Sequence, residues 1–142
     1  MPPITPAQDL YLRLIGASGQ WNAFNGPAIE NSLRANCGLW RAALLTSEVS
    51  GMRSEKPPRL RDTVDLVVLR DLPKNAVTLS TLFLLAEPGK QDSLEALAQA
   101  WEADELHWID QDEAFAAMGE GPSRNRDYLP DPRRVILRVW WD

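Results

Sequence analysis

The spacing of apolar residues near the start of the chain predicts a helix. Thr5, Pro6 and Gln8 suit an N-cap, a first-turn proline and the reciprocal partner of a capping box, and Gly16 suits the end of the helix. At the period of an α-helix, the predicted buried face carries Ala7, Leu10, Tyr11 and Leu14. A loop over 16–26 is expected to follow.

A second helix is predicted from Pro27 to about Ser47, because one apolar stripe continues through this region. Its members are spaced at helical intervals: Ile29, Leu33, Cys37, Trp40 and Leu44. Gly38 interrupts the stripe, and the pattern leaves open whether the helix runs through this glycine or begins there.

After a polar loop over 50–63, the pattern changes to strands alternating with short helices. Strands are predicted at 64–72, 76–87, 105–109 and 133–142, with helices capped by Asp92 and Asp110 after the second and third strands. In the last strand the faces alternate: one carries Val135, Leu137, Val139 and Trp141, the other Ile136 and Trp140. A long loop is expected over 119–132, and neither long loop has an assigned role.

This order predicts a fold of the α/β class. Two N-terminal helices precede β-β-α-β-α-β, and a strand–helix–strand crossover favours parallel pairing. We therefore expect a single α/β domain over residues 1–142, a sandwich with a four-stranded mixed sheet.

Composition narrows the class of protein. With 142 residues, 44% apolar and 25% charged, the chain can bury a core as one domain. A single cysteine excludes an internal disulfide, no apolar run approaches the roughly 18 residues of a membrane span, and the N-terminus lacks a signal-peptide pattern. These features predict a cytoplasmic protein that does not enter a membrane.

Charge is distributed unevenly along the chain. The net charge is -5, but residues 87–120 alone hold ten Asp and Glu against one Lys. Such a segment repels phosphates, which disfavours direct nucleic-acid binding, and it suits a protein partner with a basic surface. Six tryptophans are more than a core of this size needs, and Trp is enriched at interface hot spots. The predicted partner-binding residues are Trp21, Glu102, Asp104, Glu105, Trp108, Asp112, Glu113 and Trp140.

A metal site is one alternative. Glu87 ends a predicted strand, and Asp110 and Asp112 follow the next strand of the crossover. Open α/β sheets bind ligands at this edge, and clustered carboxylates suit Mg²⁺ or Mn²⁺. The alternative function is a metal-dependent nuclease or a phosphotransfer-like enzyme; otherwise Asp110 and Asp112 serve only the start of a helix.

A thiol hydrolase is the second alternative. Cys37, His107 and Asp110 occur in the order of nucleophile, base and orienting acid. A cysteine in the middle of a helical stripe, however, does not benefit from the partial positive charge of a helix N-terminus, which activates many catalytic thiols. The chain shows no phosphate-binding glycine loop, zinc pattern or serine elbow, so no cofactor is expected.

Two regions resemble the psi subunit of the bacterial DNA polymerase III clamp-loader complex. They are "DLYLRLIGASGQW" (9–21) and "LFLLAEPGKQDSLEALAQAWEADELHWIDQDEAFAAMGEG" (82–121). The helix and loop at 27–63 have no counterpart in that family, and its helix after the last strand is missing. The resemblance implies a bacterial accessory subunit whose N-terminal segment, with Trp21, contacts the clamp loader.

The residues themselves favour a non-enzymatic protein that acts by binding another protein. An accessory subunit, an adaptor and an immunity-type inhibitor all fit an acidic surface that contains tryptophan.

Overall fold

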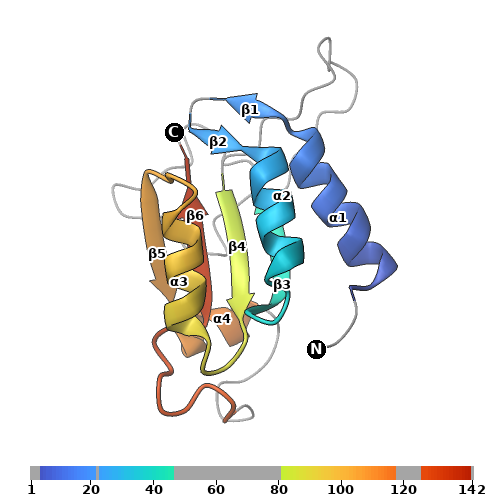
Figure 1. The fold of residues 1–142 in the computed structure, drawn as a ribbon. Helices are drawn as coiled ribbons and strands as arrows, with labels where there is room; N and C mark the ends of the chain where they lie inside the picture. Colours follow the sequence, from blue (N-terminus) through green and yellow to red (C-terminus); the bar gives the residue numbers. More distant parts are fainter. Residues whose placement is uncertain (1–3, 22, 47–80, 118–125, 142) are drawn as a thin grey trace.

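The computed structural model describes residues 4–21, 23–46, 81–117 and 126–141. These residues form helices, one main sheet and a small two-stranded sheet (Figure 1). The elements follow one another along the chain as shown in Figure 1. They are α1 (Pro6–Ala17), β1 (Gln20–Trp21), β2 (Phe24–Asn25), α2 (Gly26–Ala35), β3 (Trp40–Thr46), β4 (Thr81–Ala86), α3 (Gln91–Gln99), β5 (Glu105–Ile109), α4 (Gln111–Ala117) and β6 (Ile136–Trp140). The predicted α/β class is confirmed.

The main sheet has the strand order β3-β4-β6-β5, and each neighbouring pair is antiparallel. Strands β4 and β5 run in the same direction, as expected for a crossover through α3, but β6 lies between them and pairs with both. The predicted parallel pairing and mixed sheet are therefore wrong for the described strands. The first four residues of β6 are buried, as expected for an inner strand that is covered on both faces.

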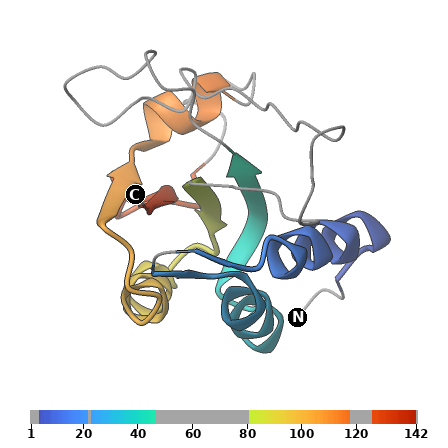
Figure 2. The ribbon, with the colours of Figure 1, turned by 90° about the horizontal axis from the view of Figure 1, so that it is seen from above.

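Helices cover both faces of the sheet. Figure 2 shows α1, α2 and α3 on one side and α4 on the other. The larger core cluster includes Leu137, Val139 and Trp141 of the C-terminal segment, whereas Ile136 belongs to the smaller cluster with Phe115 of α4. The predicted alternation is confirmed for these four residues. Val135 was predicted to share the face of Leu137, but it lies in the smaller cluster, because the regular strand begins only at Ile136.

The helix predicted from Pro27 to Ser47 is wrong in its second half. Helix α2 ends at Ala35, the Asn36 side chain donates to the Ser32 carbonyl at 2.8 Å, and β3 begins at Trp40. Gly38 lies in the turn between them, so the helix neither passes through it nor begins there. A continuous apolar run is compatible with a buried helix face and with a buried strand. In this protein the run forms a strand because it pairs with β4.

Helix α1 has the predicted cap but not the predicted buried face. Thr5 and Gln8 make both hydrogen bonds of the capping box. Leu12 and Ile15 are buried, whereas Leu10 is 65% exposed and Tyr11 38%. Helix α1 carries apolar residues around most of its circumference, so their spacing alone does not identify the buried face. Packing against α2 determines which of these residues are buried.

We expect the two faces of α1 to respond differently to truncation. Leu12→Ala removes a fully buried side chain, so it should lower the free energy of unfolding by about 2–5 kcal/mol. Leu10→Ala should change it by no more than about 0.5 kcal/mol, because the side chain is mostly in water. Urea denaturation of both variants measures this difference, and equal losses would contradict the observed orientation of α1.

The remaining predictions have mixed outcomes. Helix α3 starts after Lys90, with Asp92 in its first turn and not at its cap. Asp110 does cap α4, because its side chain accepts from the Glu113 amide at 2.9 Å. The predicted strands 105–109 and 133–142 contain β5 and β6, and 76–87 contains β4. The strand at 64–72, the loop at 50–63 and most of the loop at 119–132 lie outside the described residues.

Candidate functional site

The candidate site follows β5, the strand at one end of the sheet order. Among the described strands, β5 pairs with β6 alone and is therefore an outer strand of the described sheet (Figures 1 and 2). The segment 91–117, which contains this strand, has eight Asp and Glu and neither Lys nor Arg. We call β5 with its flanking residues 102–104 and 110–113 the β5 edge.

Acidic side chains lie where the chain enters β5. Glu102 is exposed and has φ 55°, a left-handed conformation that turns the chain out of α3. Asp104 is also exposed, and its amide donates to the Trp140 carbonyl at 2.9 Å. Glu105 opens the strand, half-exposed, with its Oε2 at 3.3 Å from Nη1 of the buried Arg138. Three carboxylates therefore meet solvent within four positions of the chain.

The side chains of β5 alternate between the two faces of the sheet. Leu106 and Trp108 pack against the larger core cluster on the α3 side and are half-buried. The Trp108 indole nitrogen donates to Glu95 Oε1 at 3.0 Å, and the Arg134 guanidinium lies 5.7 Å from its ring centroid. Exposed Glu105 and His107 occupy the alternate positions and point to the other face.

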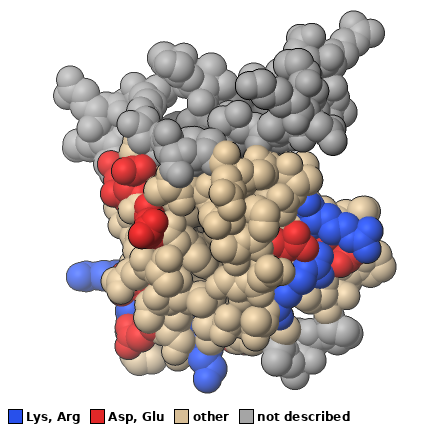
Figure 3. All heavy atoms as spheres, turned by 45° about the horizontal axis from the view of Figure 1, so that its top comes forward, with Lys and Arg blue, Asp and Glu red and all other residues tan. Residues whose placement is uncertain are grey.

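The far end of β5 is acidic as well. Asp112 is exposed and Glu113 half-buried in the first turn of α4, where the helix dipole favours negative charge. The strand between the two acidic ends spans about 13 Å at the rise of a β-strand. Figure 3 shows acidic side chains mainly on the left, the side of β5 in Figure 1, and the larger group of basic side chains on the right.

Two of the predicted tryptophans do not lie on the outer strand. Trp140 is on the inner strand β6, between Thr81 of β4 and Glu105 of β5, and is half-buried. Trp21 is in β1, opposite Phe24 of β2. The other six predicted partner-binding residues belong to the β5 edge: Glu102, Asp104, Glu105, Trp108, Asp112 and Glu113.

The structure does not assemble the alternative metal site. Glu87 and Asp110 lie at the same end of the sheet, but β6 separates their strands by two strand spacings, about 10 Å. Glu87 instead accepts from Arg41 Nε at 3.1 Å and Nη2 at 3.3 Å, Asp110 caps α4, and Asp112 is exposed. Within the described ranges, no three His, Cys, Asp or Glu side chains are placed to hold a metal ion.

A cluster around Arg41 was not visible in the sequence, because the pattern placed this residue in a helix. Besides Glu87, the Arg41 guanidinium binds Asp127 at 3.2 Å and lies 6.0 Å from the Tyr128 ring centroid. The Tyr128 hydroxyl donates to the Ala86 carbonyl at 2.6 Å. The hydrogen bond to Glu87 raises the pKa of Arg41, and burial raises the pKa of Tyr128. These contacts fasten the segment before β6 to the ends of β3 and β4.

The raised pKa of Tyr128 predicts a loss of stability in alkali. A group whose pKa is higher in the folded state contributes fully below its unfolded pKa of about 10, and this contribution is lost as the pH rises through the folded pKa. The free energy of unfolding should therefore fall above about pH 10, and Tyr128→Phe should remove part of this fall. Tyr11→Phe is the control, because it removes a tyrosine hydroxyl at a site that is more than a third exposed and leaves the contact between Tyr128 and Ala86 in place. Urea titrations between pH 8 and 11 measure how the free energy of unfolding depends on pH. Identical pH dependence in wild type and Tyr128→Phe would contradict a raised pKa for Tyr128.

The alternative thiol triad is also not assembled. Cys37 lies in the turn before β3, at one edge of the sheet, and His107 lies in β5 at the other. Three strand spacings, about 14 Å, separate these edges, which is far beyond hydrogen-bond reach. Cys37 is half-buried against the larger core cluster, which fits its place in an apolar stripe.

A shallow apolar hollow of about 140 Å³ lies between α1 and β3. It is lined mainly by Ala7, Tyr11, Leu12, Trp40, Ala42 and Ala43. Of the α1 residues that line it, Leu12 is buried and Tyr11 is 38% exposed.

Searches against known proteins return no similarity that assigns a family. No family model, no curated protein and no solved structure matches this chain. Among the described helices, none is both long and apolar enough to span a membrane. The resemblance to the psi subunit stays a prediction, since no comparison tests it.

Proposed function

We propose that this chain is a non-enzymatic protein that binds another protein through the β5 edge, as an accessory subunit, adaptor or immunity-type inhibitor. The observation that carries the proposal is the position of the acidic segment: its carboxylates flank an outer strand of the sheet and are exposed at both ends of it. The partner surface that complements this edge is basic.

The contacts of the β5 edge support a docking role. Trp108 is held in one orientation by Glu95 and by the Arg134 guanidinium, which lies over its ring, so it offers a rigid, half-buried aromatic side chain within the edge. Charged residues at both ends steer a basic partner toward it and make association depend on salt. The residues of the two enzymatic alternatives, in contrast, make contacts within the fold or lie at opposite sheet edges.

A double neutralisation tests this proposal. The variant Glu102→Gln/Asp104→Asn removes two exposed charges and keeps the side-chain shapes. Ala17→Lys/Asn31→Lys is the matched control, because it changes the net charge by the same amount at exposed positions of α1 and α2. The full chain is immobilised and exposed to a lysate of the cells that carry its gene.

We expect wild type and control to retain the same protein in equimolar amount, the neutralised variant to retain at least fivefold less, and 0.5 M salt to release it. If all three chains bound the partner equally, the contact would lie outside the β5 edge, and the proposal would be wrong. Absence of any retained protein would argue against a binding function.

A further inference from the structure

We propose that the partner contributes an extended, basic segment that adds to the sheet as a further strand along β5. This inference rests on the proposed function and specifies how the β5 edge recognises its partner. The segment alternates cationic and apolar side chains.

The backbone at the β5 edge supports strand addition. An outer strand presents N–H and C=O groups along its unpaired side, and these match the groups of an extended peptide. Strand β5 has five residues in regular antiparallel register with β6, from Glu105 opposite Trp140 to Ile109 opposite Ile136. Among the described strands, it has no second neighbour. A strand added there would lie about 4.8 Å away.

The two faces of β5 specify the alternation. On the α4 side, a neighbouring strand would place its side chains beside Glu105 and His107, where a lysine or arginine would share the Glu105 carboxylate with Arg138. On the α3 side, its alternate side chains would lie beside half-buried Leu106 and Trp108, where apolar groups extend the larger core cluster. Because the period of a strand is two, one register satisfies both faces.

Charge selects the occupant. Arg138 pairs with Glu105 and Arg134 pairs with Asp92, but Glu102, Asp104 and Asp112 are exposed at the two ends of the strand. A neutral or acidic strand therefore gains less at this edge than a basic one. The same charges discourage a second copy of β5 from pairing there, because the carboxylates of the two copies would repel.

Synthetic peptides test the proposal on the full chain. The probe is acetyl-KVKVKVK-amide, measured by calorimetry at 50 and 200 mM NaCl. Two further peptides carry N-methyl groups on either the valine or the lysine nitrogens, which blocks one edge of the strand at a time. A fourth peptide, acetyl-KKKVVVK-amide, keeps the composition and loses the alternation.

We expect the alternating peptide to bind, one N-methylated form to bind at least tenfold more weakly and the other within threefold of the parent. The non-alternating peptide should bind at least fivefold more weakly. The variant Glu102→Gln/Asp104→Asn should weaken binding, and Ala17→Lys/Asn31→Lys should not weaken it to the same extent.

Some results would overturn strand addition. Equal binding of all four peptides would show attraction between charges without backbone pairing, and strand addition would be wrong while the proposed function stood. A second result would also reject strand addition: no peptide binds, but the chain still captures a partner in a way that depends on Glu102 and Asp104. That result would leave the proposed function intact. Peptide binding without a cellular partner would support the edge geometry and count against the proposed function.

Discussion

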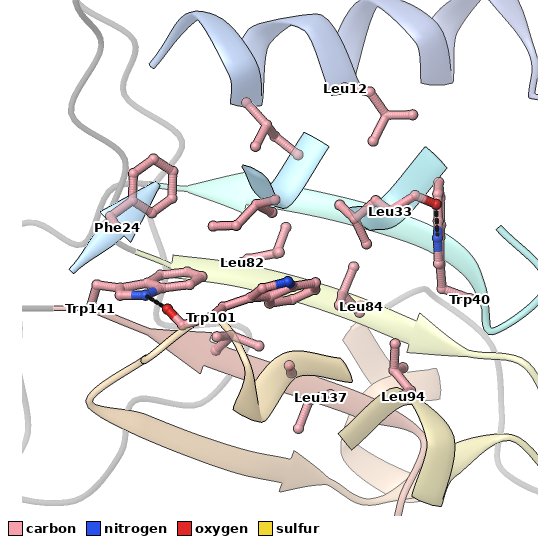
Figure 4. Packing of buried hydrophobic residues seen from close by; sticks show 14 of the residues in the cluster. Leu12, Phe24, Leu33, Trp40, Leu82, Leu84, Leu94, Trp101, Leu137 and Trp141 are labelled. Atoms are coloured by element: carbon pink, nitrogen blue, oxygen red, sulfur yellow. Dashed lines mark hydrogen bonds between the residues drawn. The ribbon is translucent and has the colours of Figure 1, made fainter. Parts of the chain in front are cut away.

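Trp141→Ala is expected to lower the free energy of unfolding by about 3–5 kcal/mol. The side chain is 1% exposed and lies in the larger core cluster (Figure 4). Its indole nitrogen donates to the Trp101 carbonyl at 3.1 Å, and its ring meets Phe24 edge-on with centroids 5.0 Å apart. Truncation would leave both a cavity and a buried carbonyl without its donor.

The neighbouring tryptophan provides the control. Trp140 is half-buried on the other face of the sheet, so Trp140→Ala should cost clearly less than Trp141→Ala. Urea denaturation followed by far-ultraviolet circular dichroism measures both variants without relying on tryptophan fluorescence. A loss below about 1 kcal/mol for Trp141→Ala would contradict the packing in Figure 4.

Gly26→Ala is expected to have the second large effect, about 1–3 kcal/mol of lost stability. Gly26 is the first residue of α2, and its amide donates to the Gly19 carbonyl at 2.8 Å. A β-carbon at this position would overlap the Ile15 carbonyl oxygen and lie 2.9 Å from that of Gly19. Both obstacles are backbone atoms where α1 and α2 meet, so the helices must separate to admit a methyl group.

Gly16→Ala is the matched control. A β-carbon at position 16 would also overlap a neighbour, but that neighbour is the end of the Glu30 side chain, which can rotate away. An alanine inside a helix gains up to about 1 kcal/mol over glycine, which offsets the partial loss of the pair between Glu30 and Arg34. Thermal unfolding should show Gly16→Ala close to wild type and Gly26→Ala well below it; similar shifts for both would contradict the close approach of α1 and α2.

Local signals in the sequence predicted several elements well. The capping box at Thr5 and the Asp110 cap appear in the structure, and so does the period-two alternation from Ile136 onward, though not at Val135. These features depend on neighbours in the chain, so a short window contains the information.

Other features depend on partners distant in sequence. Residues 40–46 form a strand because β4 pairs with them, although Ala and Leu also suit a helix. The central place of β6 between β4 and β5 follows from packing of the whole sheet, and adjacency in sequence favoured a parallel neighbour instead. The buried face of α1 is likewise chosen by α2.

The candidate site was predictable in its chemistry and only partly in its geometry. The acidic segment and Trp108 were found from composition, and they lie together along one outer strand. Trp140 entered the same prediction but lies on an inner strand, because its position depends on how β6 joins the sheet. Glu87 and Asp110 were expected to meet at one end of the sheet. The position of β6 between their strands and the contact of Glu87 with Arg41 could not be predicted from the sequence spacing.

The most direct test of the central claim is amide hydrogen exchange on the full chain, alone and with its captured partner. If the partner docks on the β5 edge, amides within residues 102–113 should exchange at least tenfold more slowly in the complex, with backbone groups of β5 among the most protected. Unchanged exchange over residues 102–113, with protection confined to α1 and α2, would contradict the claim.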